Sequence, residues 1–204
     1  MLLGYHGCHT DQARLLLQCS GFHASDKPYD WLGNGVYFWE SDPVRAYQWA
    51  LERRSNSPCV IGAVIDPGNC LDLTKQSGIA AVQRAYSSYL SLQTKFGKPV
   101  PQNLVGRGSR PSDFVRRFLD CAVIDHLHDS YAAASKQSLG VAKGFDTVRA
   151  LFPEGNELFD RSGFKDKTHV QIAVRNQRQV LGVFRVPVWQ LSELSLPLDI
   201  YSGL

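Results

Sequence analysis

The sequence predicts an α+β domain, and three observations indicate this fold class. Short runs of β-branched and aromatic residues, such as Val36–Trp39, have strand length and occur towards both ends of the chain. Thr168–Arg175 alternates apolar and polar side chains, as a strand with one covered face does. Between these regions, residues 79–92 and 113–135 are rich in Ala, Leu and Arg and predict helices. We therefore expect one domain over residues 1–204, with a helical insertion at about residues 75–140.

The composition is that of an ordinary globular protein, with 44% hydrophobic and 20% charged residues. A net charge of +3 is too small to indicate nucleic-acid binding by itself, although it is compatible with a local basic patch. The five cysteines show no Cys-x-x-Cys spacing, so we expect reduced thiols in a cytoplasmic protein and neither disulfides nor a metal site. No apolar run has the length of a membrane span, so no membrane partner is expected.

The first elements are a strand and a helix. Leu2–His6 has the composition of a short strand. A helix follows, with Thr10 as its expected cap and Gly21 as its end. Phe22–Asp30 then reads as a loop because it contains Ser-Asp-Lys-Pro.

The most informative stretch is Trp31–Glu40. Gly33 and Gly35 bracket Asn34, and such a run allows a tight turn or the approach of a ligand to the backbone. An aromatic strand follows directly. A helix then extends from Ser41, its expected cap, to about Arg54.

The remaining strands lie on either side of the predicted helices. Their expected ranges are Cys59–Asp66, Asn69–Leu73, Phe145–Phe152, Thr168–Arg175 and Gln179–Val186. Asn176–Arg178 predicts a turn, so we expect the last two strands to form a hairpin. Within the first of these two strands, Val170, Ile172 and Val174 share one face, whereas His169 and Gln171 share the other.

Two motifs near the N-terminus resemble those of a known enzyme family. His6-Gly7-Cys8 resembles the His-Gly-Ser/Thr motif of the diphtheria-toxin and poly(ADP-ribose)-polymerase group of ADP-ribosyltransferases. Gly35–Glu40 resembles that group's Gly-Ile-Tyr-Phe-Ala-Asp motif. The order and separation of the motifs also match. The resemblance implies a split antiparallel β-sheet core that carries the helical insertion, and NAD as co-substrate with no metal.

The resemblance also assigns roles to residues. In the family the histidine contacts the adenosine-side ribose of NAD, the next glycine holds the nicotinamide amide through its backbone, and the tyrosine stacks on the nicotinamide ring. These roles fall on His6, Gly7 and Tyr37, and Cys8 and Gly35 complete the two cofactor-binding motifs. Tyr47 stands where the family often has a second aromatic wall, but its spacing also fits the apolar stripe of its helix. A serine that the family often has near Arg45 is absent.

The expected C-terminal hairpin resembles the family's last motif, and Gln171 stands at the position of the catalytic glutamate. In polymerising members that glutamate bonds the ribose 2′-hydroxyl, stabilises the oxocarbenium-like charge and activates the acceptor. Gln171 can form the hydrogen bond but cannot act as a general base. Loss of the charge costs on the order of 3 kcal/mol of transition-state stabilisation unless another carboxylate replaces it. Many members without the glutamate transfer a single ADP-ribose, and we expect the same here.

A replacement carboxylate would have to come from the loop before this strand, where the family has its acceptor loop. Glu154 is the best candidate because it follows a predicted strand directly, and the alternative is that it is an exposed turn residue. His169 shares the face of Gln171 and could donate a hydrogen bond to the substrate, or it could be a plain strand residue.

The middle of the chain contains a basic group that could bind an anionic acceptor such as RNA or DNA. A solvated loop and helix face is the alternative interpretation. The group consists of Lys95, Lys98, Arg107, Arg110, Arg116 and Arg117. His126 and His128 do not share a helix face, and we expect no catalytic role for them.

Together these features predict a mono-ADP-ribosyltransferase that transfers ADP-ribose from NAD to a nucleic acid, such as RNA, or to a protein. By analogy with small members of the family, it would be a toxin, held by an antitoxin partner or acting in phage defence. The alternatives are an inactive NAD or ADP-ribose-binding module, an NAD glycohydrolase, and a thiol hydrolase that uses Cys8.

Overall fold

The computed structural model describes residues 1–18, 20–53, 56–105, 114–137, 144–187 and 189–191. Within these residues the fold is α+β, as the sequence predicts, with four helices, a seven-stranded sheet and a two-stranded hairpin. The helices are α1 (Thr10–Leu17), α2 (Pro43–Arg53), α3 (Gln76–Lys95) and α4 (Phe118–Gln137). The sheet strands are β1 (Leu2–His9), β2 (Val36–Glu40), β3 (Pro58–Ile65), β4 (Cys70–Asp72), β7 (Thr147–Phe152), β8 (His169–Val174) and β9 (Val180–Arg185).

The seven strands are ordered β4-β7-β8-β2-β1-β3-β9. The β4–β7 pair is parallel and the other pairs are antiparallel, so the sheet is mixed. The β1–β2 junction is short, because only Gly4 with Glu40 and Tyr5 with Trp39 are in register. Beyond Tyr5, β1 pairs with β3 alone and the rest of β2 pairs with β8 alone. The sheet therefore consists of a β4–β7–β8–β2 half and a β1–β3–β9 half that are joined over two residue pairs.

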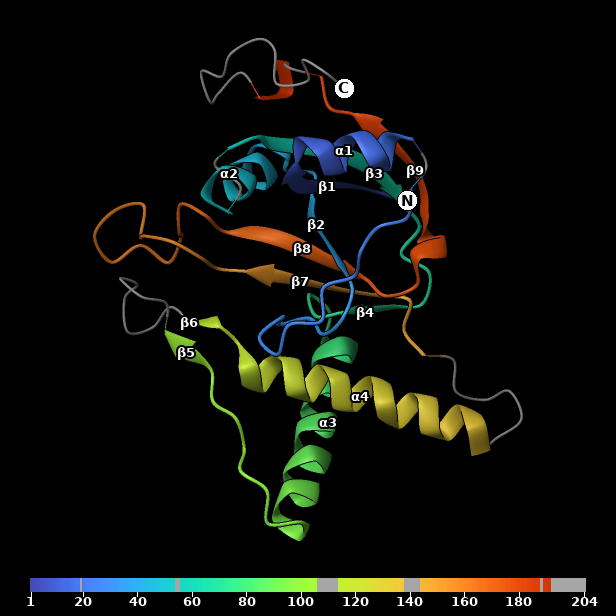
Figure 1. Ribbon diagram of the computed structural model, residues 1–204. Coiled ribbons are helices and arrows are strands. Elements are labelled where there is room, and N and C mark those ends of the chain that lie inside the picture. Colours follow the sequence, from blue (N-terminus) through green and yellow to red (C-terminus); the bar gives the residue numbers. More distant parts are fainter. Residues whose placement is uncertain (19, 54–55, 106–113, 138–143, 188, 192–204) are drawn as a thin grey trace.

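Different helices cover most of each half, and α2 also contacts β2 through Trp39 (Figure 1). The α2 helix packs on β1 and β3, and α1 packs on another part of the same half. The α3 and α4 helices pack on each other and on the β4–β7 side of the sheet, where Leu71, Val148 and Ala173 meet Ala81 and Ile124. The predicted helical insertion therefore supplies one cover of the sheet.

The expected C-terminal hairpin is wrong. The β8 strand pairs with β2 and β7, whereas β9 pairs with β3 at the far edge of the sheet. After β8 the chain is held by Asp146, whose carbonyl oxygen accepts from the amides of Arg175 and Asn176. The carbonyl oxygen of Gln179 then accepts from the amide of Asp66 at 2.9 Å, at the end of β3. These bonds direct the chain across to β3 instead of back along β8.

Local capping also differs from expectation. The side chain of Asp42, and not that of Ser41, accepts the amide of Arg45 at 2.8 Å in the first turn of α2. His9, and not Thr10, caps α1 by accepting the amide of Asp11. That helix ends at Leu17, before Gly21.

The predicted helix from residue 113 also begins later than expected. The α4 helix starts at Phe118, because Phe114–Arg116 forms strand β6 of the small hairpin with β5 (Leu104–Val105).

Candidate functional site

His6 lies where β1 and β2 separate. Its Nδ1 is 2.9 Å from the carbonyl oxygen of Tyr37, so the side chain bridges the two halves of the sheet. A carbonyl oxygen only accepts, so Nδ1 carries the proton and Nε2 has a free lone pair in the neutral ring. Burial lowers the pKa of His6, which favours this neutral form at pH 7. Phe22 and Phe38 flank the imidazole, with ring centroids 5.5 and 5.6 Å away.

The Cα of Gly7 faces α2, whereas the side chain of Cys8 lies on the opposite side of β1. A Cβ atom at Gly7 would collide with the carbonyl oxygen of Ala46, so the glycine allows α2 to approach the strand. The thiol of Cys8 is buried with Leu16 and Cys59 in the cluster beneath α1. The glycine therefore has a packing reason for its identity, independent of any ligand, and the thiol is enclosed.

Tyr37 uses its hydroxyl to hold the glycine turn. The hydroxyl donates to the carbonyl oxygen of Gly33 at 2.8 Å and accepts the amide of Leu32 at 3.0 Å. Burial, together with the nearby charge of Asp30, raises the pKa of Tyr37. The ring packs on the cluster below α3 and α4. Gly35 lies at the start of β2, where a Cβ atom would be 3.1 Å from the carbonyl oxygen of Val174.

Gln171 lies in the middle of the sheet, between Trp39 of β2 and Ala150 of β7. Its Oε1 accepts a hydrogen bond of 2.6 Å from the indole Nε1 of Trp31, in the glycine turn. The ring centroid of Trp31 is 4.8 Å from that of Phe152. The guanidinium carbon of Arg117 lies over both rings, 4.8 and 4.2 Å from their centroids.

Glu154 forms an ion pair of 2.8 Å with Arg45 of α2. The side chain of Arg45 is only 5% exposed and that of Glu154 is 20% exposed, so Glu154 is not the exposed turn residue of the alternative interpretation. The charge of Glu154 is compensated by Arg45, and its role as a replacement carboxylate stays a prediction.

His169 lies close to this ion pair. Its Nδ1 donates to the carbonyl oxygen of Lys167 at 2.6 Å, which leaves a lone pair on Nε2. Burial lowers the pKa of the ring, and the charge of Arg45 acts in the same direction. Its ring contacts Trp39 at 6.0 Å between centroids. In the described residues, Trp39 Nε1, Arg45 Nε and Nη1, and His169 Nε2 are buried without a hydrogen-bond partner.

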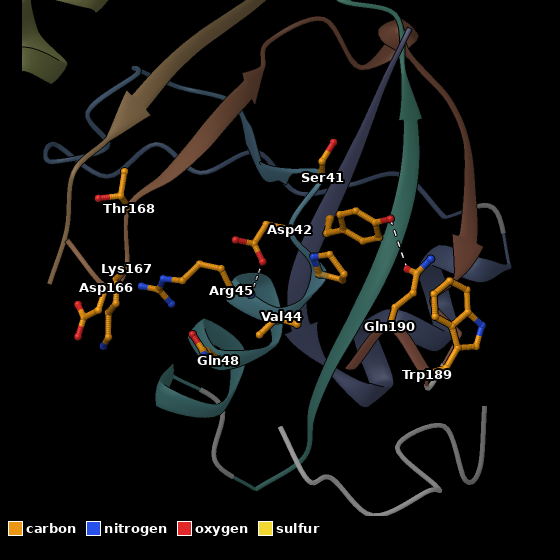
Figure 2. A pocket seen from close by; sticks show the side chains of 12 residues that line it. Ser41, Asp42, Val44, Arg45, Gln48, Asp166, Lys167, Thr168, Trp189 and Gln190 are labelled. Carbon is orange, nitrogen blue, oxygen red and sulfur yellow. Dashed lines mark hydrogen bonds between the residues drawn. The ribbon is translucent and has the colours of Figure 1, made fainter. Parts of the chain in front are cut away.

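A cavity of about 640 Å³ opens beside these groups, at the N-terminal end of α2 (Figure 2). Arg45 and Gln48 of α2 line it together with the loop before β8, which includes Lys167 and Thr168. Tyr47 does not line this cavity, because its side chain is buried in the core with Tyr5 and Trp39. The lining has both charge signs, because Asp42 and Asp166 also contribute to it. His6, Gly7 and Tyr37 lie outside this cavity.

The predicted basic group is only partly described. Arg107 and Arg110 lie outside the described residues. Lys95 and Lys98 are exposed near the end of α3, as a cationic surface requires. Arg117 is 17% exposed and stacks on aromatic rings, so it is not part of such a surface.

The two histidines of α4 lie in different surroundings. His126 is 3.0 Å from the hydroxyl of Ser88, and His128 is buried. None of the helices in the described parts of the chain has both the length and the apolar character needed to cross a membrane.

Trp31 and Arg45 are the residues that sequence reasoning missed. Trp31 was visible only as the first residue of the glycine stretch, and Arg45 only as a departure from the family's pattern. Their contacts with Gln171 and Glu154 join positions 140 and 109 residues apart, which no local pattern reveals.

Comparison with known proteins finds one distant relative and assigns no family. The chain is 23% identical over 194 residues to the uncharacterized protein MJ0359 of Methanocaldococcus jannaschii, and the match covers 84% of this chain and 81% of that protein. No family model matches the chain. No solved structure matches it either.

Proposed function

We propose that this protein is an NAD-dependent mono-ADP-ribosyltransferase with the split-sheet core of the diphtheria-toxin and poly(ADP-ribose)-polymerase group. The observation that carries the proposal is the separation of β1 from β2 after Tyr5, with His6 bonded to the carbonyl oxygen of Tyr37 across the gap. The two motifs that resemble the family are therefore joined by this bond, with the ring of His6 between Phe22 and Phe38 and the ring of Tyr37 on the cluster of α3 and α4. The α3–α4 region is the insertion of this proposal, and the dinucleotide lies in the gap between the two halves of the sheet.

In this proposal the chain binds NAD chiefly by shape and hydrogen bonding. His6 offers the Nε2 lone pair to a ribose hydroxyl, Gly7 offers its backbone, and Tyr37 supports the turn beside the nicotinamide. The bond between nicotinamide and ribose C1′ breaks, a nucleophile of the acceptor attacks C1′, and the nucleophile loses its proton. Gln171 is neutral, so charge stabilisation from this position is weak and the chain is suited to single transfer.

The acceptor has to reach the same ribose, and we place it beside the cavity at the N-terminal end of α2. Support comes from the cavity wall, which includes Lys167 and Thr168 of the loop at the family's acceptor position. Glu154 can act as a base there only when its ion pair with Arg45 opens. His169 has a lone pair on Nε2 close to this ion pair, but that atom is buried, so it can act as a base only if the surrounding side chains move.

Incubation with labelled NAD and a cell extract tests the proposal. We expect a labelled macromolecule with the wild type and loss of the signal in His6→Ala, because the bond from His6 to β2 and its contact to the ribose are both removed. His126→Ala, at a histidine bonded only to a serine among the described residues, is the matched control and should keep the signal. Absence of label with the wild type, or unchanged label in His6→Ala, contradicts the proposal.

The acceptor class is decided by digestion of the labelled product. Loss of label with ribonuclease indicates RNA, and loss with protease indicates protein. The exposed Lys95 and Lys98 favour a nucleic acid, and a protein acceptor is the second candidate. A toxin of this kind, of a toxin–antitoxin or a phage-defence system, would require a neutralising antitoxin partner.

Two related functions share the same pocket. An NAD glycohydrolase would use water as acceptor and release free ADP-ribose. A binding module would hold NAD or ADP-ribose without breaking it, and the neutral Gln171, bonded to Trp31, favours this alternative most. Release of nicotinamide separates the binding module from both enzymes. A thiol hydrolase is disfavoured by the buried position of Cys8.

A further inference from the structure

We propose that Trp31 is a positioning residue that fixes the side-chain amide of Gln171 for the reaction. This inference rests on the proposed function. Their hydrogen bond is 2.6 Å long and joins the glycine turn before β2 to the centre of β8. The resemblance assigns no role to Trp31.

The chemistry of the indole determines the orientation of the amide. An indole Nε1 is a donor only, so the atom of Gln171 that faces it is Oε1 and not Nε2. The amide nitrogen then lies on the other branch of the side chain, away from the indole. Rotation of the amide by 180° would place two N–H donors against each other. Trp31 therefore removes the rotational freedom that a terminal amide ordinarily has.

The indole is itself held in place from two sides. The hydroxyl of Tyr37 bonds to the backbone of Leu32 and Gly33, directly after Trp31. The amide of Gly33 donates to the carbonyl oxygen of Asp30 at 2.7 Å, which closes the turn on its other side. The backbone on both sides of the indole is thus tied down.

The ring of Trp31 is clamped as well. Phe152 contacts it at 4.8 Å, and the guanidinium of Arg117 covers both rings. Stacking of arginine on aromatic rings is favourable and resists displacement. Trp31 thus transmits the rigidity of the turn to Gln171.

This arrangement leaves the amide nitrogen of Gln171 as the hydrogen-bond donor for a substrate group. One lone pair of Oε1 is used by Trp31, whereas both N–H groups of Nε2 face away from it. We infer that the substrate group beside Gln171 offers an acceptor oxygen, such as that of a ribose hydroxyl. A glutamate at this position could keep the bond to Trp31 with one oxygen and place the second oxygen, with its share of charge, where Nε2 now lies.

A double-mutant cycle tests the role of Trp31. The variants are Trp31→Phe, Gln171→Ala and their combination, and kcat, KM for NAD and the NAD dissociation constant are measured for each. Trp31→Phe keeps an aromatic ring for Arg117 but removes the N–H donor. We expect it to lower kcat about tenfold, the size of one hydrogen bond, with KM changed less than about twofold. In the Gln171→Ala background the same change should have almost no effect.

Trp49→Phe is the matched control. It removes a half-buried indole on α2, and that indole contacts Trp39 and not Gln171. It should leave kcat unchanged. Equal effects of Trp31→Phe in the wild-type and Gln171→Ala backgrounds, or a change in KM alone, overturn the proposal.

A readout without activity separates this proposal from the function. In a ¹⁵N–¹H spectrum the indole resonance of Trp31, assigned by its loss in Trp31→Phe, should shift in Gln171→Ala and stay in place in Trp49→Phe. Absence of that shift overturns the positioning role even if the enzyme is active. If the resonance shifts but the protein neither binds nor cleaves NAD, the contact between Trp31 and Gln171 is confirmed. The proposed function, and with it the role of Trp31 in catalysis, is then overturned.

Discussion

At the scale of single residues, the site is defined by side chains that are already committed to structural bonds. The hydroxyl of Tyr37 holds Leu32 and Gly33, Nδ1 of His6 holds the strand of Tyr37, and Oε1 of Gln171 is bonded to Trp31. In His6 and Gln171 the second polar atom, Nε2 in each, makes none of these bonds and is the atom that the proposed function assigns to the ligand. The orientations of these side chains are therefore fixed by hydrogen bonds, and those of His6 and Gln171 join segments that are distant in sequence.

Gln171→Glu is the most informative single substitution at this scale. The new carboxylate can accept the bond from Trp31 and adds a negative charge beside the developing oxocarbenium ion. We expect transferase turnover to rise about 100-fold, the usual effect of one well-placed charge or donor in a transition state. Steady-state rates of nicotinamide release measure the change, with Gln83→Glu, at an exposed position of α3, as a matched charge control. A fall in turnover would show that Gln171 is not at the reacting ribose.

At the scale of elements, the α2 helix and the β1–β2 junction determine the shape of the site. The α2 helix approaches β1 so closely that Gly7 leaves no room for a Cβ atom against the carbonyl oxygen of Ala46. The first turn of the same helix supplies Arg45 to the ion pair with Glu154. A shift of this helix would therefore alter both the bare backbone of β1 and the cavity beside the loop.

Gly7→Ala tests this packing. The added methyl group forces α2 away from β1, and overpacking of this kind should lower the free energy of unfolding by about 1–3 kcal/mol. Urea denaturation measures it. Gly182→Ala is the control, because a Cβ atom on β9 has no neighbour within 4 Å. Equal free energies of unfolding for the two variants would mean that α2 does not pack closely against Gly7.

The sequence was informative about elements and less so about their arrangement. The strands at Leu2, Val36, Cys59 and His169 were predictable because their β-branched and aromatic runs are local signals. The hairpin of β8 and β9 was not, because the bonds from Asp146 and Gln179 that separate them are made with distant segments. His6 and Tyr37 were chosen from their motifs, and their roles as site residues stay predictions. The contact between Trp31 and Gln171, and the pair of Arg45 with Glu154, depend on tertiary packing and left no local pattern.

At the scale of the whole molecule, the two halves of the sheet are mostly covered by different helices and are joined over two residue pairs. Beyond Tyr5 the strands β1 and β2 no longer pair, and we propose that the dinucleotide binds in the gap between them. In the proposed function, the acceptor approaches from the N-terminal end of α2. The central claim is that this gap binds NAD through His6.

Isothermal titration calorimetry of NAD into the wild type and His6→Ala tests this claim most directly. We expect saturable binding to the wild type. For His6→Ala we expect a dissociation constant at least about tenfold larger, because one hydrogen bond to a buried partner is lost. His126→Ala should bind like the wild type, which controls for the loss of an imidazole elsewhere. Heats at the level of dilution for the wild type, or equal dissociation constants for wild type and His6→Ala, would contradict the account.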